Sequence, residues 1–186
     1  MRLRLFASLL PIFAVCTLSN AQVLKPDEQR YKLLATLRTS TMEKELNDAA
    51  TQGYRILVGS PASGNEIAIF LERAGSTVEP YRYKLLATAR TSTMQKELNE
   101  AAEGGYRLLP RTMMAKGQPP SGAEIVVILE RPPAAEKRYE YRLLATNRTT
   151  TLQKEVTEAQ TAGFVIVGMI SRVEHMVILE REIRPK

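Results

Sequence analysis

The chain has 186 residues, of which 44% are hydrophobic and 25% charged, and its formal net charge is +6. Basic residues recur beside acidic ones instead of gathering into a patch with aromatic side chains, so a nucleic-acid-binding role is not expected. A single cysteine excludes a fold held by several disulfide bonds, and stability must come from a packed core.

The first 21 residues have the features of a signal peptide. Arg2 and Arg4 precede an apolar stretch over residues 5–15, and Ser19-Asn20-Ala21 supplies the small residues that a signal peptidase needs. We expect cleavage after Ala21 and a mature protein that is periplasmic or secreted. The apolar stretch is shorter than the about 20 residues of a membrane span, and we expect no transmembrane segment in the mature chain.

Cys16, the only cysteine, raises the alternative of a lipoprotein. Val15 is branched where an acylation signal has a small residue just before the cysteine. We therefore expect Cys16 to be removed with the signal peptide. Residues 22–30 then form a polar lead-in.

Three near-copies of one segment follow and define the domain organisation. Repeat 1 covers residues 31–73, repeat 2 covers 83–131 and repeat 3 covers 139–181. Units of this length are near the lower limit at which a domain buries enough surface to be stable alone. We expect the repeats to pack together as a pseudo-symmetric array, in preference to beads on a string.

Each repeat is predicted to be α+β, with the element order β-α-β-β. In repeat 1, residues 31–36 alternate as a strand does, a second strand starts at Tyr54, and residues 67–71 are almost continuously apolar. A β-α-β connection joins parallel strands, and a short loop joins antiparallel ones. We therefore expect a mixed three-stranded sheet with one helix on a face, and a third strand that is covered on both faces.

The helix of each repeat has an apolar stripe and marked ends. In repeat 1 the stripe is formed by Met42, Leu46, Ala49 and Gly53. A capping box is predicted at each helix start, from the pairs Ser40/Glu43, Ser92/Gln95 and Thr150/Gln153. A left-handed C-terminal cap is predicted at Gly53, Gly105 and Gly163.

The repeated segments resemble a group of small bacterial domains, the domain-of-unknown-function family 4177. The likeness rests on the Tyr-x-Leu opening strand, the short amphipathic helix ending in Gly-Tyr or Gly-Phe, and the closing strand ending in Leu-Glu-Arg. It covers most of residues 31–181, in three copies. Because the family has no established activity, the resemblance implies a fold and supplies no catalytic residue.

Two groups of residues are candidate binding sites. An arginine before each predicted helix suits a small anionic ligand, with an ion pair to a nearby glutamate as the alternative. These arginines are Arg38, Arg90 and Arg148. The longest loop, in repeat 2, carries thioether and cationic side chains that suit a protein or ligand, with a tolerated insertion as the alternative. Its candidate residues are Arg111, Met113, Met114 and Lys116.

The sequence contains no recognisable catalytic or metal-binding motif. Its single histidine, His175, is expected to mark an exposed strand start. We predict no cofactor and a non-enzymatic binding or interaction module of the bacterial cell envelope, with a protein partner or self-association. The alternatives are an unrecognised hydrolase or transferase with a site between the repeats, and a purely structural scaffold.

Overall fold

The computed structural model describes residues 29–62, 65–75, 79–117, 123–171 and 174–183. Repeat 1 contains β1 (Tyr31–Thr36), α1 (Thr39–Thr51), β2 (Tyr54–Pro61) and β3 (Ile67–Arg73). Repeat 3 has the same order, with β8 (Arg138–Thr146), α3 (Thr149–Thr161), β9 (Val165–Ser171) and β10 (His175–Ile183). The predicted signal peptide, with Cys16, lies outside the described residues.

Repeat 2 differs from its neighbours in the second strand. Its elements are β4 (Arg82–Thr88), α2 (Thr91–Glu103), β5 (Arg107–Leu108), the 3-10 helix η3 (Pro110–Thr112), β6 (Met114–Lys116) and β7 (Glu124–Arg131). Pro110 has no N–H with which to continue the ladder, so β5 is short. The chain then returns to the same partner strand, and β6 pairs with β7.

The fold is α+β, as predicted, with three α-helices and three small antiparallel sheets in the described residues. The strand orders are β1-β3-β2, β4-β7-β5 and β8-β10-β9. The last strand of each repeat lies between the first two and is antiparallel to both. The expectation of a mixed sheet is therefore wrong. The most apolar strand takes the central position, because there both its edges are paired and its side chains are best covered.

The helices bury the predicted stripe and end at the predicted glycines. In α1, Met42, Leu46 and Ala49 are fully buried. The glycines that follow the helices have left-handed φ values of 81°, 85° and 86°, at Gly53, Gly105 and Gly163 respectively, so the C-terminal caps are confirmed. No helix among the described residues is long and apolar enough to cross a membrane.

The capping boxes are not formed. Each helix begins two residues earlier than the box requires, and its N-cap residue makes no side-chain capping hydrogen bond. These N-cap residues are Arg38, Arg90 and Arg148. Two of the supposed box residues, Glu43 and Gln95, bind the backbone of the following repeat instead.

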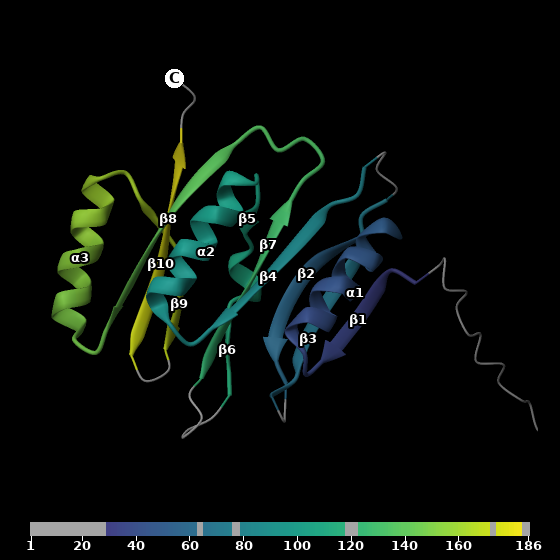
Figure 1. Ribbon diagram of the computed structural model, residues 1–186, viewed down its shortest axis with the longest axis horizontal. Helices are drawn as coiled ribbons and strands as arrows, with labels where there is room; N and C mark the ends of the chain where they lie inside the picture. The colour runs from purple at the N-terminus through teal and green to yellow at the C-terminus, as the bar shows by residue number, and fades with distance from the viewer. Residues whose placement is uncertain (1–28, 63–64, 76–78, 118–122, 172–173, 184–186) are drawn as a thin grey trace, which may run out of the picture.

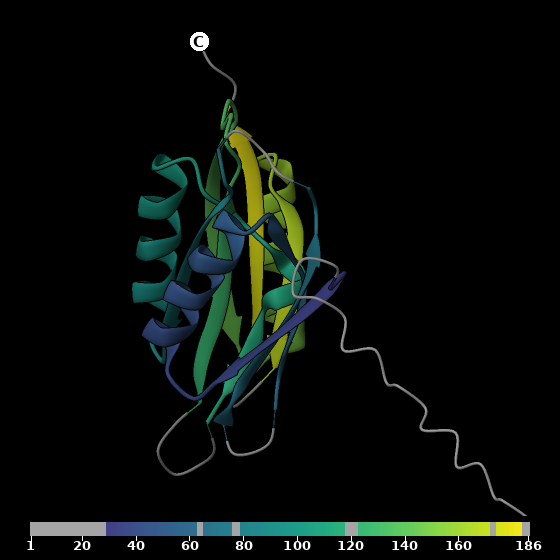
Figure 2. The same cartoon turned by 90° about the vertical axis from the view of Figure 1, so that its right-hand side faces the viewer.

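The repeats form a head-to-tail array in which repeat 2 lies between repeats 1 and 3 (Figure 1). One core cluster combines side chains of repeats 1 and 2, and another combines repeats 2 and 3. A smaller cluster belongs to repeat 3 alone. Helix α1 packs beside β4 and α2 beside β8, so each interface uses the same elements. Figure 2 shows α1 and α2 together on one side of the sheets and α3 towards the other, so the array twists.

The position of a repeat in this array decides whether its central strand is covered on both faces. In the middle repeat, residues 125–129 of β7 are all fully buried. In repeat 1, β3 is covered only on the helix side, and Phe70 is exposed on the other face. The prediction of a third strand covered on both faces therefore fails for repeat 1, because no repeat precedes it.

Candidate binding surfaces between the repeats

An arginine, a glutamate and a tyrosine join repeat 1 to repeat 2. Arg55, on β2, donates from Nε and Nη2 to the two carboxylate oxygens of Glu130, at 2.9 and 2.6 Å. The Tyr83 hydroxyl donates to Glu130 Oε2 at 3.0 Å and accepts the backbone N–H of Ile56 at 3.2 Å. Glu130 is buried on β7, and these donors replace the water that its charge has lost.

An equivalent cluster of an arginine, a glutamate and a tyrosine joins repeat 2 to repeat 3. Arg107, on β5, donates from Nε and Nη2 to Glu180 at distances between 2.8 and 3.2 Å. The Tyr141 hydroxyl donates to Glu180 Oε2 at 2.8 Å and accepts the N–H of Leu108 at 2.8 Å. Glu180, like Glu130, is buried. The array therefore uses one polar interface twice.

The protonation states of these clusters are held by their surroundings. Burial, together with the adjacent carboxylate, raises the pKa of the Tyr83 and Tyr141 hydroxyls. Hydrogen bonds to the carboxylates raise the pKa of the Arg55 and Arg107 guanidinium groups. The tyrosines therefore remain neutral donors and the arginines remain cations at physiological pH.

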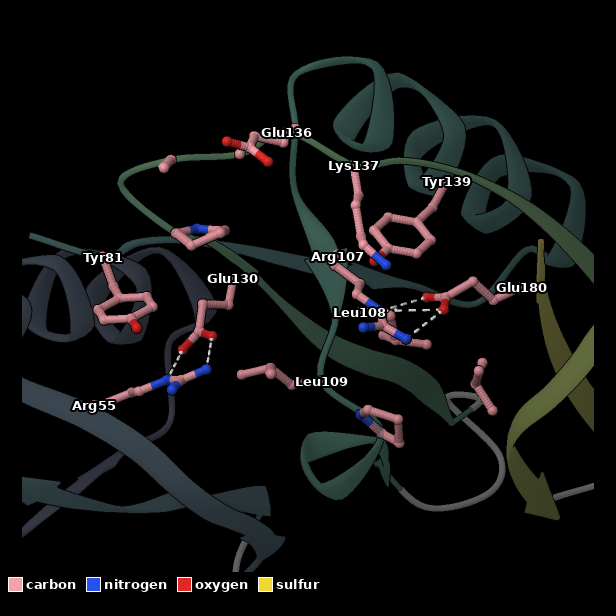
Figure 3. A pocket seen from close by; sticks show the side chains of 16 residues that line it. Arg55, Tyr81, Arg107, Leu108, Leu109, Glu130, Glu136, Lys137, Tyr139 and Glu180 are labelled. Atoms are coloured by element: carbon pink, nitrogen blue, oxygen red, sulfur yellow. Dashed lines mark hydrogen bonds and ion pairs between the residues drawn. The ribbon is translucent and has the colours of Figure 1, made fainter. Parts of the chain in front are cut away.

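A cavity of about 570 Å³ lies between the two clusters (Figure 3). It is lined by residues of all three repeats, including Arg55 from repeat 1, Leu109 from repeat 2 and Val167 from repeat 3. The rings of Tyr81 and Tyr139 also line it. Arg55 lies over Tyr81 and Arg107 over Tyr139, each with its guanidinium carbon 4.5 Å from the ring centroid. The cavity therefore lies where the three repeats meet.

The charged groups lining this cavity are mostly engaged in ion pairs. Glu130 and Glu180 each accept from an arginine and a tyrosine, and Lys137 pairs with Glu182 at 3.0 Å. A general base must have a carboxylate or amine free to take a proton from the substrate. The two buried carboxylates do not offer this, so the arrangement favours a structural use of these repeated Arg and Glu residues.

Side chains on α1 bridge the edge strand of the following repeat. Asn47 Nδ2 donates to the carbonyl oxygen of Tyr83 at 2.9 Å, and Asn47 Oδ1 accepts the Tyr83 N–H at 3.0 Å. Glu43 accepts the N–H of Leu85 at 2.8 Å. The corresponding bonds of α2 are made by Asn99 to Tyr141 and by Gln95 to Leu143. These side chains satisfy edge-strand groups that another strand would otherwise pair.

The two methionines of the predicted contact loop lie inside the array. Met114 is buried in the core shared by repeats 1 and 2. Met113 packs on repeat 3, where a Cβ added to Gly168 would lie 2.3 Å from its sulfur. Their adaptable side chains therefore contact the two neighbouring repeats. The last part of the loop, residues 118–122, lies outside the described residues.

The two cations of that loop also contact repeat 1. Arg111 Nη2 donates to the carbonyl oxygen of Ile56 at 3.0 Å, and Lys116 Nζ donates to the carbonyl oxygen of Leu37. The inserted segment of repeat 2 therefore links the units of the array through both its apolar and its basic residues.

The three arginines predicted to hold an anion lie at the N-caps of separate helices. Each backbone N–H donates to the hydroxyl of the threonine two residues earlier, at 3.1 to 3.3 Å. The bonds are Arg38 to Thr36, Arg90 to Thr88 and Arg148 to Thr146. None of these arginines lines the cavity between the repeats. Glu72, a glutamate at the end of β3 in the same repeat as Arg38, pairs with Arg30 at 2.8 Å.

His175 begins β10, where its ring Nδ1 lies 3.1 Å from the Ser171 hydroxyl. It is half-buried. Across the part of the chain that the structure describes, no group of three His, Cys, Asp or Glu residues could hold a metal ion.

The residues that join the repeats were missed by sequence reasoning, although the sequence contains a signal for them. Asn47 and Arg55 recur in repeat 2 as Asn99 and Arg107, but repeat 3 has Thr157 and Val165 at these positions. Repeat 3 is the last of the three copies. The replacement of the asparagine and the arginine there fits their use in repeats 1 and 2 as contacts to the following repeat.

The fold and these interfaces define an α+β protein of three small antiparallel-sheet units joined in series. Comparisons of the chain with protein-family models, with curated proteins and with solved structures found no match. The resemblance to the domain-of-unknown-function family stays a prediction.

Proposed function

We propose that the chain is an exported, non-enzymatic interaction module of the bacterial cell envelope, built from three copies of one β-α-β-β repeat. The signal-peptide features of residues 1–21 support export. The equal order of elements in repeats 1 and 3, and the same plan with an insertion in repeat 2, support duplication of one unit. The resemblance to the bacterial domain family supports the same origin.

The observation that carries the proposal is the location of exposed large apolar side chains. In the described residues they are confined to repeats 1 and 3, the two ends of the array. They are Tyr31, Leu33, Leu37, Val58, Phe70, Val165, Ile166, Met169 and Ile183. Repeat arrays that end in solvent carry a polar outer face on their terminal repeats. Apolar ends therefore indicate surfaces that a partner covers.

The outer face of repeat 1 concentrates this surface. Phe70, on the central strand, pairs in register with Leu33 on β1 and with Val58 on β2. The three residues are 47%, 52% and 43% exposed, respectively. Fully burying one such side chain contributes about 1.5–3 kcal/mol, so covering three half-exposed ones contributes about 2–4 kcal/mol. This row is the surface on which we place binding.

The cavity at the junction of the repeats is where a hydrolase or transferase site would lie. Its two buried carboxylates are engaged by arginine and tyrosine donors, which favours binding over catalysis for the recurrent polar residues. A structural scaffold would use the same apolar ends as an interaction module, and the nature of the partner separates the two roles.

Site-specific photocrosslinking of the full chain in the producing bacterium tests the proposal. A photoreactive side chain replaces Phe70, and the matched control carries it at Lys96, an exposed position on repeat 2 with a 76% exposed side chain. We expect a discrete adduct from the envelope fraction at position 70 and none at position 96. The absence of an adduct at 70, or equal labelling at both positions, contradicts the proposed binding face.

A further inference from the structure

Building on this proposed interaction role, we propose that the outer face of repeat 1 binds repeat 3 of a second copy of this chain. The contact would repeat the interface that joins consecutive repeats within the chain. That interface occurs twice internally, between repeats 1 and 2 and between repeats 2 and 3. Its two unused halves are the outer face of repeat 1, called the acceptor end below, and the helix side of repeat 3, called the donor end.

The acceptor end has the same chemistry as the acceptor faces inside the array. Tyr83 of repeat 2 is 2% exposed beneath the preceding repeat, whereas the equivalent Tyr31 is 43% exposed. Ile128 is fully buried at the position that Phe70 holds in repeat 1. The acceptor end therefore lacks only the repeat that would cover it.

The donor end is exposed at the positions that the internal donor faces bury. Ile166 pairs with Leu179 in β10 as Ile56 pairs with Leu71 in β3, so the two isoleucines are equivalent. Ile56 is 2% exposed under repeat 2, and Ile166 is 51% exposed. Val165 beside it is exposed as well. Both ends of the array are thus apolar where the internal interfaces are packed.

The charged residues at both ends of the array differ from their counterparts in the internal interfaces. Internally, a buried glutamate receives an arginine from the preceding repeat, as Glu130 receives Arg55. At the acceptor end, Glu72 is paired by Arg30, which directly precedes repeat 1 and whose Nε and Nη2 lie 3.0 and 2.8 Å from Oε1. At the donor end, Val165 replaces the arginine. Contact between the ends therefore buries no unpaired carboxylate.

The donor end also keeps part of the edge-strand bridge. Gln153 on α3 stands at the position of Gln95, which accepts the N–H of Leu143 at 2.9 Å. The equivalent N–H of the acceptor end belongs to Leu33 on the edge strand β1. Thr157 replaces the asparagine with a single hydroxyl, so the contact between chains has fewer hydrogen bonds than the internal ones. We expect a reversible association.

A third difference between the donor end and the internal donor faces concerns the size of one side chain on the second strand. In the internal interface, a Cβ on Gly59 would lie 3.1 Å from Met114 Cε and 3.4 Å from Thr112 Cα, both in the inserted segment of repeat 2. Repeat 1 has no such insertion between β2 and β3. Met169 stands at the position of Gly59 in the donor end and is 55% exposed. In the proposed contact its side chain would fill the space that the insertion occupies internally.

An interface between two different surfaces leaves each complex with one free end of each kind, so the association continues into open chains or closes into a ring. A pair of copies that met through the same face would instead stop at a dimer. This difference makes the proposal testable with one charged substitution at each end.

The test measures the mass of the purified mature chain by light scattering and sedimentation over a range of concentrations. The parent is expected to grow beyond a dimer as concentration rises. Phe70→Asp blocks the acceptor end, and Ile166→Asp blocks the donor end, so each variant alone is expected to be monomeric. An equimolar mixture of the two retains one good end of each kind and is expected to give a dimer of the two variants. Ser92→Asp, which adds the same charge on exposed repeat 2 surface, is expected to associate like the parent.

Other outcomes overturn the proposal in distinguishable ways. If Phe70→Asp is monomeric while Ile166→Asp stays dimeric, two acceptor ends meet each other and the head-to-tail contact is refuted. If the parent is monomeric up to millimolar concentration, self-association is refuted, whereas an adduct of position 70 with another envelope protein would leave the proposed function standing. Circular dichroism of each variant checks that the exposed substitutions leave the fold intact.

Discussion

Removing one partner of the buried pair between Arg107 and Glu180 is expected to destabilise the protein more than removing both. Glu180 is 3% exposed, and Arg107→Met leaves it with the Tyr141 hydroxyl as its donor. Breaking a buried pair from one side costs about 3–5 kcal/mol. Because the arginine side chain is itself half-exposed, we expect the lower end, about 3 kcal/mol. For a chain of this size that lowers Tm by about 6–12 °C.

Urea and thermal unfolding of the mature chain, followed by circular dichroism, measure this loss. Arg55→Met is the matched change in the other interface and is expected to cost a similar amount, because Glu130 has the same set of donors. The double variant Arg107→Met/Glu180→Met leaves no unpaired buried charge and is expected to recover most of the stability. A loss below about 1 kcal/mol in Arg107→Met, or a double variant no more stable than the single one, refutes the reasoning.

Three further predictions about other parts of the array are tested by unfolding measurements. Asn99→Ala removes both bonds to the Tyr141 backbone and is expected to cost about 1–3 kcal/mol. Thr157→Ala, at the equivalent position of the last repeat, is expected to change stability by less than about 0.5 kcal/mol, and equal losses contradict the edge-strand bridge. Burial raises the pKa of Tyr83 and Tyr141 in the folded protein, so neither tyrosine affects the pH dependence of stability below about pH 10. Above that pH both tyrosines ionise in the unfolded chain and stay neutral in the folded one. The free energy of unfolding therefore falls by up to about 2.7 kcal/mol per pH unit for the two groups together. A slope that is the same after both tyrosines are changed to Phe would show another origin. Gly163→Ala, at a φ of 86°, is expected to cost about 1 kcal/mol, and an unchanged Tm would show that the backbone adapts.

The parts of the fold that sequence predicted correctly depend on residues close together in the chain. The spacing of Met42, Leu46 and Ala49 defines a helix face, and Gly53 can end that helix because of its own backbone freedom. Strand order is different, because β1 and β2 are separated by β3, which comes later in the chain. Its position depends on how much apolar surface each strand buries in the finished sheet, and local periodicity does not report this.

The interface residues were missed because a local explanation competed with a distant one. Glu43 lies three residues after Ser40, a spacing that indicates a capping box, yet its carboxylate accepts the N–H of Leu85 in another repeat. The same pattern fits both roles, and only the packed array decides between them. The third copy resolves the ambiguity for Asn47, since Thr157 replaces it in the last of the three repeats.

Differences between the copies are explained by their positions in the array. Only repeat 2 has a neighbour on each side, and only repeat 2 carries the insertion that sends Met114 into repeat 1 and Met113 onto repeat 3. Glu72 of repeat 1 is paired without an arginine from another repeat, because Arg30 pairs with it. An array whose ends served only to terminate it would need polar side chains there. The apolar residues at both ends, with Phe70 at one and Ile166 at the other, are therefore the feature that internal packing leaves unexplained and that binding explains.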